Sequence, residues 1–535
     1  MNRTILIGLD GAPFSLLDPL AESGVMPFLR EFLQTGSRAP LRSTPHPLTP
    51  PAWTSLMTGR SPGHHGIFDF IWAEQRESNH YFTIHNYRDI RSETIWSLVS
   101  RQQGTITTLN FPFLAPPPRV NGFVVPGFVS WKYLRRNVYP RDLYDELKTL
   151  PGFDVKELAW DFEQEKKAEQ GVPEEEYERW VDFHIARERQ WFAVTRRLLR
   201  QHPTDLTAIL FDGLDKILHM GYRFVDPQLF PAEPSAWECR LRDRCHDYFR
   251  ELDGFIEEIV ELGGPEARVF IASDHGFGPT WYVFRANTWL AEQGYLVWQD
   301  LDRLDEADRR AAQKVADRHF VMLDWERTTA YARTVTSNGI FIRRQKSPGD
   351  GGVPPEEYHE FRAELIRKLK DVREPDTGRP LIVDVLLKED VFSGPNNEQA
   401  PDLTLVMRDH GFLSIKHKEP VVLRRPVVEG THYPDGVFAA RGPGIRAGAS
   451  LPTLSILDVA PALMYSLGLP IPSDFEGHLP QAAFEAEQLD RQPPQVGPPT
   501  ESPDLETESV ANSGLSDQEE EEEVYKRLKA LGYVE

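Results

Sequence analysis

Cysteine and long apolar runs are the scarcest features of this sequence. Only Cys239 and Cys245 occur among 535 residues, which excludes a disulfide framework and a four-thiolate zinc site. The apolar stretch before Asp10 is too short for the core of a signal peptide, and no run approaches the roughly 20 apolar residues of a membrane span. These absences predict a cytoplasmic protein that has no membrane partner.

Positive charge is also in short supply. The 82 acidic residues outnumber the 60 Lys and Arg residues and leave a formal net charge of -22. A nucleic-acid groove and an anionic membrane surface both require clustered Lys and Arg, so neither is expected as a partner. A small anionic substrate would need local positive charge, for which bound metal is the obvious source.

Apolar segments of strand length recur along the chain, and each ends in polar residues or glycine. Helical stretches such as residues 191–201 and 245–264 separate several of them. Uninterrupted apolar strands covered by helices indicate an α/β fold with a mostly parallel sheet sandwiched by helices. Such sheets bind ligands beyond the carboxyl ends of their strands. The expected strands are residues 4–10, 105–111, 206–213, 268–276, 402–407 and 436–442.

Three regions depart from this strand and helix pattern. Residues of about 126–200 and 285–400 have the composition of insertions, or cap segments, on the α/β core. Residues 490–535 hold 12 acidic and four basic side chains, so 486–518 is expected to be a disordered linker. Residues 519–535 predict an amphipathic C-terminal helix, which is either a solvated tail or a segment that docks on the body or on a partner.

The segment LTPPAWTSLMTGRSPGHHGIFDF, residues 48–70, has two interpretations. Threonine is a favoured helix N-cap and proline a favoured first helical residue, so Thr49 and Pro50 can simply begin a short helix that ends at Gly59. Alternatively, Thr49 is the residue that performs the chemistry. The rest of the chain decides between them.

Residue types that suit metal binding stand where several expected strands end. Asp215 and His219 are four residues apart, so they share one face of a helix, and Asp274 and His275 leave the same strand end. Each such residue alone is more often a turn former or a structural histidine, so the prediction depends on the set. Nitrogen and oxygen donors in this number suit two ions of zinc or manganese. The candidate ligands are Asp10, Asp215, His219, Asp274, His275 and His432.

The order of these motifs resembles the alkaline phosphatase superfamily, and most closely its type I phosphodiesterase/nucleotide pyrophosphatase branch. In that branch a nucleophilic threonine is followed at fixed intervals by a proline, a Thr-Gly pair and a His-Gly-Ile triplet, as occurs here at Thr49, Pro51, 58–59 and 65–67. The insertion at 285–400 is more similar to an uncharacterised bacterial group of predicted phosphohydrolases or phosphomutases.

This resemblance implies an alkaline-phosphatase-like catalytic domain over residues 1–485 that hydrolyses phosphodiester or phosphomonoester bonds of small molecules. It implies Thr49 as the nucleophile and two divalent metal ions, zinc first and manganese second. In that arrangement one metal is held by Asp10, Thr49, Asp274 and His275, and the other by Asp215, His219 and His432.

Two departures from the branch leave the substrate open. The branch usually carries an asparagine where this chain has Phe70, so a polar contact to phosphate is missing. Because Pro50 and Pro51 have no N–H, the helix start offers an anion chiefly the N–H groups of Thr49 and Ala52. The sequence therefore does not decide between monoester and diester.

Other functions remain to be weighed against hydrolysis. Sulfatases require a Cys or Ser nucleophile with a nearby arginine, and the stretch from Thr49 to Trp53 has neither. Phosphoryl transfer to a second alcohol, as in a phosphomutase, uses the same site and stays open. A non-catalytic interaction scaffold that acts through the acidic tail is the remaining alternative. If the protein is an enzyme, Lys216 is a further candidate for compensating the charge of the substrate.

Overall fold

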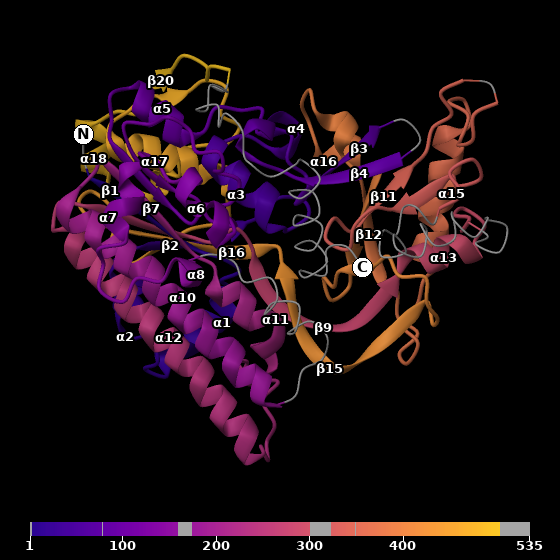
Figure 1. Ribbon diagram of the computed structural model, residues 1–535, viewed down its shortest axis with the longest axis horizontal. Coiled ribbons are helices and arrows are strands. Elements are labelled where there is room, and N and C mark those ends of the chain that lie inside the picture. The colour runs from indigo at the N-terminus through magenta and orange to yellow at the C-terminus, as the bar shows by residue number, and fades with distance from the viewer. Residues whose placement is uncertain (1–2, 77–78, 159–173, 300–322, 348, 503–535) are drawn as a thin grey trace.

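A large sheet forms the centre of the molecule. The computed structural model describes residues 3–76, 79–158, 174–299, 323–347 and 349–502, arranged as in Figure 1. In spatial order the strands are β17 (Ala449–Ser450), β2 (Ser37–Arg42), β16 (Asp435–Arg441), β8 (Arg268–Ala272), β1 (Thr4–Leu9), β7 (Leu206–Phe211), β5 (Ile106–Leu109) and β6 (Gly122–Val125), with β18 (Leu454–Ser455) also pairing with β2.

The predicted α/β fold with a mostly parallel sheet is confirmed. β1 pairs in parallel with β7 and β8, and β5 pairs in parallel with β6 and β7. Every residue of β1 and β7 is buried, as expected for parallel strands covered on both faces. The exception to the parallel pattern is β16, which runs antiparallel to both of its neighbours.

Helices cover both faces of this sheet, as the sequence pattern predicted. Along β1, Ile5 and Ile7 belong to the core on one face and Leu6 to the core on the other, because strand side chains alternate. The first face is covered by α1 (Phe14–Glu22), α2 (Pro27–Thr35), α6 (Trp131–Asn137), α7 (Asp142–Leu147), α8 (Val155–Leu158), α10 (Glu174–Gln201), α11 (Gly213–Val225) and α12 (Ala236–Gly263). The second is covered by α3 (Thr49–Thr58), α5 (Ile95–Arg101) and α17 (Val459–Leu467), with α4 (Pro62–His65) beside α3.

The two expected insertions have different architectures. The helices within 126–200 pack in the layer against the central sheet, where α10 adds Trp191 and Leu198 to its core. The region 285–400 instead has a hydrophobic core of its own, at the right of Figure 1. Its sheet has the order β10 (Ala330–Ala332), β11 (Gly339–Ile342), β13 (Leu403–Met407), β12 (Ile382–Leu387), accompanied by α13 (Ala286–Glu292), α15 (Tyr358–Lys370) and α16 (Lys388–Val391).

This arrangement corrects the expected place of residues 402–407. Their apolar run is the strand β13, but β13 pairs antiparallel with β11 and β12 and has no partner in the central sheet. An apolar run reports burial and not the sheet to which a strand belongs, so the sequence could not make this distinction.

A long ribbon connects the central body to the inserted sheet. β9 (Gly276–Arg285) and β15 (Val422–Tyr433) pair antiparallel, and β14 (Leu413–Ser414) pairs in parallel with β9. His432 lies near the end of β15, shortly before β16 begins at Asp435. The ribbon begins next to Asp274 and His275, so the connection between the two sheets starts at the candidate ligands.

The ordered body continues past residue 485, where the sequence placed the start of a disordered linker. Residues 486–502 include α18 (Ala486–Arg491) and β20 (Val496–Gly497), which pairs with β19 (Ile471–Pro472). The acidic composition predicted disorder there, but polar contacts with the body hold this segment. The rest of the predicted linker and the expected helix at 519–535 lie outside the described residues.

Smaller elements complete the described chain, and none of its helices suits a bilayer. Over the described ranges, no helix combines the length and apolar character that a membrane span requires. The small elements are the hairpin of β3 (Ile71–Arg76) and β4 (Asn79–Ile84) and the short 3-10 helices Tyr87–Asp89, Asn397–Gln399, Ile456–Asp458 and Gln481–Ala483.

Candidate active site

The candidate ligands meet at the carboxyl ends of the central strands. Asp10 follows β1, and Asp274 and His275 follow β8. The first turns of α11, which begins after β7, carry Asp215 and His219. His432 reaches the same place from β15, and Thr49 from the start of α3. The structure thus brings together all seven residues that the sequence singled out, although their roles stay predictions.

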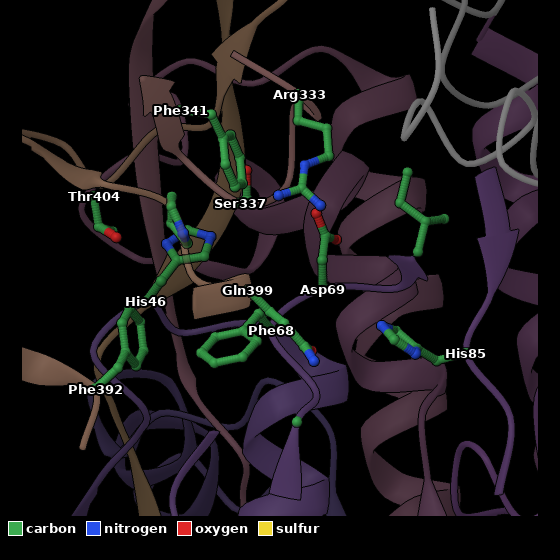
Figure 2. A pocket seen from close by; sticks show the side chains of 13 residues that line it. His46, Phe68, Asp69, His85, Arg333, Ser337, Phe341, Phe392, Gln399 and Thr404 are labelled. Atoms are coloured by element: carbon green, nitrogen blue, oxygen red, sulfur yellow. The ribbon is translucent and has the colours of Figure 1, made fainter. Parts of the chain in front are cut away.

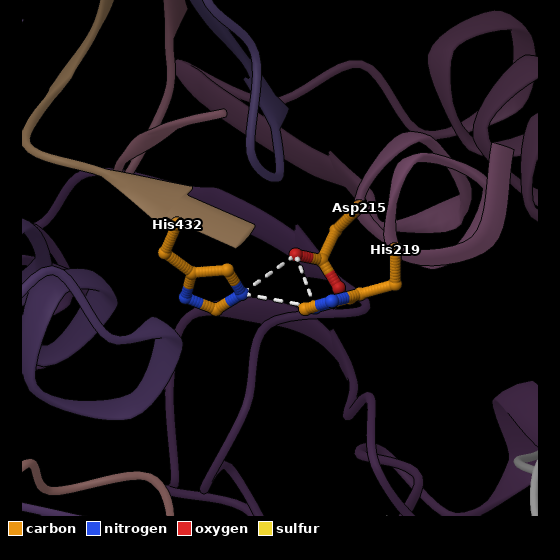
Figure 3. Close-up of side chains that lie close together, drawn as sticks. All are labelled: Asp215, His219 and His432. Carbon is orange, nitrogen blue, oxygen red and sulfur yellow. Dashed lines mark hydrogen bonds and ion pairs between the residues drawn. The ribbon is translucent and has the colours of Figure 1, made fainter. Parts of the chain in front are cut away.

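One cluster consists of Asp215, His219 and His432, shown in Figure 3. Asp215 Oδ1 lies 3.1 Å from His432 Nε2 and 3.5 Å from His219 Nε2, and the two Nε2 atoms are 3.1 Å apart. The predicted helical spacing of Asp215 and His219 is realised on α11. The His219 side chain is 36% exposed, against 4% for each of the other two, so this cluster opens to solvent at His219.

The second cluster consists of Asp10, Asp274 and His275, and all three are buried. His275 Nε2 lies 3.5 Å from Asp10 Oδ1 and 3.3 Å from Asp274 Oδ2. Thr49 Oγ1 lies 3.3 Å from the same Nε2 atom. The hydroxyl of Thr49 therefore reaches the donor atoms of this cluster.

The two clusters are adjacent. His275 Nε2 lies 3.9 Å from Asp215 Oδ1, and the rings of His275 and His432 stack with centroids 3.6 Å apart. Metal ions held by the two clusters would lie close enough together to act on one substrate group.

Hydrogen bonds from the surrounding protein orient the ligand side chains. His275 Nδ1 donates to the Gly276 carbonyl over 2.9 Å and His432 Nδ1 to the Pro47 carbonyl over 3.1 Å, so both rings present Nε2 to the centre. Backbone N–H of Gly11 donates to Asp274 Oδ1 over 3.1 Å. These contacts use the outer atoms of the ligands and keep the inner atoms available.

The carboxylate oxygens that face the centre of the two clusters show whether these residues suit a metal ion. Asp10 Oδ1, Asp215 Oδ1 and Asp274 Oδ2 are buried without a hydrogen-bond partner in the described part of the chain. Unsatisfied buried carboxylate oxygens are costly, and divalent cations would satisfy them. A donor set of carboxylates and imidazoles, with no thiolate, also suits a catalytic site of zinc or manganese. The residues present therefore fit two metal ions.

The pKa shifts at the site follow the same physics. Burial raises the pKa of Asp10 and Asp274 well above the usual value for aspartate, and the charge of Asp215 raises both further. Burial lowers the pKa of His275 and His432, which favours the neutral imidazole that binds metal. Burial also raises the pKa of Asp215, but the nearby histidines and Lys216 outweigh it and hold that pKa well below its usual value.

The start of α3 differs from the expected N-cap. Leu48 is the N-cap and Thr49 is the first helical residue, with no side-chain cap. The N–H of Ala52 donates to the Leu48 carbonyl over 3.0 Å, so it is not available to an anion as the sequence suggested. Since Pro50 has no N–H, the backbone donor left at this helix start is that of Thr49.

Sequence reasoning missed several residues that support the site. Trp53, one turn into α3, donates its indole N–H to Asp10 Oδ2 over 3.3 Å. Behind α11, the fully buried Arg187 forms an ion pair with Asp212, and Asn110 donates to the same carboxylate over 2.9 Å. A polar residue at a strand end was the available signal for Asn110, whereas nothing local marked Arg187.

The predicted loss of a polar contact at Phe70 is observed, because the Phe70 ring is buried near the ring of Phe128.

Comparison with known sequences decides the family. The type I phosphodiesterase/nucleotide pyrophosphatase family profile matches residues 4–435, most of the chain. The chain belongs to this family. The predicted resemblance is thereby confirmed, as is the predicted enzyme class of hydrolases that act on phosphoester bonds. The two His/Asp clusters are consistent with the two-metal site typical of the family.

Solved structures show the same fold at low sequence identity. Murine ectonucleotide pyrophosphatase/phosphodiesterase 5 is 12% identical, with a TM-score of 0.51 over 90% of this chain and 100% of that chain. Phosphonoacetate hydrolase from Sinorhizobium meliloti, solved with phosphonoformate, is 14% identical, with a TM-score of 0.51 over 87% of this chain and 95% of that chain. A comparison with curated proteins gives no match.

Proposed function

We propose that this member of the family is a phosphohydrolase in which Thr49 is the nucleophile and two divalent cations are bound. The cluster of Asp10, Asp274 and His275, with Thr49, holds one cation, and the cluster of Asp215, His219 and His432 holds the other. The observation that supports this most directly is the 3.3 Å distance between Thr49 Oγ1 and His275 Nε2. It places a hydroxyl among donor atoms that suit a metal ion.

The reaction proceeds in two displacements at phosphorus. Two divalent cations held by these residues would supply positive charge that lowers the pKa of the Thr49 hydroxyl and stabilises the charge that develops on phosphate oxygens. Thr49 Oγ forms a bond to phosphorus while the bond to the leaving-group oxygen breaks, which gives a phosphothreonine and an alcohol. Water then cleaves the bond between phosphorus and Thr49 Oγ, and the threonine is regenerated.

The substrate is a small phosphate ester. The Thr49 N–H at the start of α3 can donate to a phosphate oxygen, and Lys216 lies close by with Nζ 3.6 Å from Asp215 Oδ2. Phe70 and the proline pair supply no further donor, so the protein contacts on the phosphate are few.

We propose zinc as the metal, with manganese as the alternative. We also propose a cytoplasmic location, which cell fractionation with an antibody would test.

Substitution of Thr49 tests the nucleophile. Thr49→Ala should lower turnover of p-nitrophenyl phosphate and bis-p-nitrophenyl phosphate by on the order of 10³-fold or more, because the covalent step of the proposed mechanism uses the hydroxyl of this residue. Thr49→Ser keeps the hydroxyl and should retain measurable turnover. Activity of the alanine variant within tenfold of wild type would remove Thr49 as nucleophile. The wild-type rate ratio for the two esters would show the preference for monoester or diester.

Metal content tests the two-cation site without reference to turnover. Elemental analysis of the purified protein should find about two divalent ions per chain, and Asp215→Asn should lose about one of them. Asp226→Asn, at the other end of α11, is the matched control and should keep both. Less than about one ion per wild-type chain would favour the non-catalytic scaffold.

A further inference from the structure

A pocket lies between the central body and the inserted sheet. It is partly open to solvent. His46 and Asp69 line it from the body, and Arg333, Phe341 and Thr404 from the insertion, as Figure 2 shows. None of these residues belongs to the two metal clusters.

Arg333 is the arginine of this pocket, and the charges of Asp69 and Asp402 act on it, although no carboxylate of the described residues lies within ion-pair distance. Its guanidinium lies over the ring of Phe341, with the central carbon 3.7 Å from the ring centroid. Its Nε is buried without a hydrogen-bond partner among the described residues. Burial lowers the pKa of the guanidinium and outweighs the charges of Tyr331, Asp69 and Asp402, which raise it, so these groups compensate its charge only in part.

The single carboxylate that lines the pocket, Asp69, points toward Arg333 in Figure 2, but its hydrogen bonds go to other groups. Asp69 accepts hydrogen bonds from the hydroxyls of Thr334 and Thr336, over 2.5 Å and 2.7 Å, and from the N–H of Phe70 over 2.7 Å. These bonds tie the segment that carries Arg333 to the catalytic body. Asp69 thus holds Arg333 in place while the planar fork of guanidinium N–H donors remains for a ligand.

The pocket is next to the candidate active site. His46, three residues before Thr49, donates from Nε2 to the Thr336 carbonyl. The ring of Phe412 lies edge-on to both His46 and His432, with centroid distances of 5.9 Å and 4.9 Å. A single aromatic ring therefore separates a wall of the pocket from a ligand of the metal clusters.

We propose that Arg333 binds an anionic group, a carboxylate or phosphate, on the leaving-group side of the substrate. This role rests on the proposed function, because it requires that Thr49 attacks a phosphate ester whose remainder extends past Phe412 into the pocket. The planar guanidinium, stacked on Phe341, matches the two oxygens of a carboxylate or phosphate. Arg333 would then be a specificity residue, and the substrates would be phosphate esters with a second negative charge.

A substrate series of varied length tests this role. The probes are phosphate monoesters of ω-hydroxy carboxylic acids with one to four methylene groups, each paired with its carboxamide, and phosphate release is measured. For at least one length, wild type should prefer the carboxylate by about 10- to 100-fold in kcat/KM, the usual effect of charge-assisted hydrogen bonds. Arg333→Met should bring this ratio to about one and leave kcat/KM for the carboxamide within about twofold.

Matched variants separate charge from packing. Methionine preserves the apolar contact with Phe341, and Arg333→Lys, which keeps the charge without the fork, should show an intermediate ratio. Arg327→Met removes an arginine of the same insertion whose side chain is 70% exposed, and it should leave the ratio unchanged. Equal loss on carboxylate and carboxamide in Arg333→Met would overturn the role, as would a wild-type ratio near one at every length.

Calorimetric titration of the full-length, metal-loaded protein with inorganic phosphate is independent of turnover. Arg333→Met should bind about one phosphate fewer per chain than wild type, whereas Arg327→Met should not. Loss of that phosphate without any carboxylate preference would identify a free anion as the occupant and overturn the leaving-group role. If wild type hydrolysed none of the esters, the proposed function itself would fail, and the two failures are thereby distinguished.

Discussion

Two buried tryptophans differ in a single polar contact. The indole N–H of Trp53 donates to Asp10 Oδ2 over 3.3 Å, and that of Trp96 donates to the sulfur of Met57 over 3.3 Å. Both rings are fully buried, and both lie against the ring of Phe111. Trp53 therefore holds a candidate metal ligand, whereas Trp96 serves packing.

We expect Trp53→Phe to weaken metal binding by roughly 10-fold, the lower end of the effect of losing a contact that orients a ligand. Titration against a competing chelator measures this affinity. Trp96→Phe makes the same change of ring at a site away from the ligands, so its metal affinity should equal that of wild type. Equal affinities in both variants would show that the Asp10 contact does not matter for the metal.

At the same scale, the sequence predicted the candidate ligands but not the residues around them. Asp10, Asp274 and His275 stand at strand ends, where an α/β sheet collects its site, so the local pattern carried the signal. Arg187 and Arg333 carry no such signal. Their importance depends on burial and on which side chains face them, and those properties arise from segments far apart in the sequence.

Helix α3 packs on β1 at a glycine. A Cβ atom added to Gly8 would lie 2.8 Å from Cη2 of Trp53 and 3.0 Å from Cδ1 of Leu210. The close approach of α3 to the strand that carries Asp10 thus requires the absence of a side chain at this position. It also sets the distance between Thr49 and the cluster at the strand end.

We expect Gly8→Ala to lower the free energy of unfolding by about 1–3 kcal/mol, because the core there has no room for a methyl group. Gly254→Ala is the contrasting substitution. It lies within α12, where nothing stands within 4 Å of an added Cβ, so it should raise stability by up to about 1 kcal/mol. Urea denaturation measures both, and a stable Gly8→Ala protein would contradict the packing argument.

Element types could largely be predicted from the sequence, but strand partners could not. The runs at 4–10, 206–213 and 268–276 form neighbouring strands of the central sheet. Residues 402–407 have the same apolar character, yet they form β13 of the inserted sheet. Periodicity and apolar content are local properties, whereas pairing depends on contacts between distant segments.

At the scale of the whole molecule, residues 486–502 fasten to the body behind α3. The side-chain Nε2 of Gln492 donates to the backbone carbonyl of Tyr465 over 2.8 Å. The Tyr465 hydroxyl in turn donates to the backbone carbonyl of Gln492 over 2.9 Å. Thr500 donates from its N–H and its hydroxyl to Asp474, over 2.8 Å and 2.6 Å, and Asp474 is also paired with Arg60. Arg60 comes immediately after Gly59, the C-cap of the helix that begins at Thr49.

We expect a chain that ends at residue 485 to be less stable than one that ends at residue 502, by about 2–4 kcal/mol for these hydrogen bonds. Thermal unfolding of the two chains gives the comparison. The shorter chain should also lose phosphoester hydrolysis at a lower temperature, because the support behind α3 is gone. Identical unfolding of the two chains would show that residues 486–502 add nothing to the body.

The sequence by itself determined the fold class, the family and the set of candidate ligands, because apolar strand patterns and the residues at strand ends are properties of short stretches of sequence. Only the tertiary structure decided that Thr49 is the first helical residue and not the cap, and that β13 joins a second sheet. It also decided that Arg333 faces a pocket beside His46. These outcomes depend on contacts between segments that lie far apart in the sequence, and no local sequence pattern predicts such contacts.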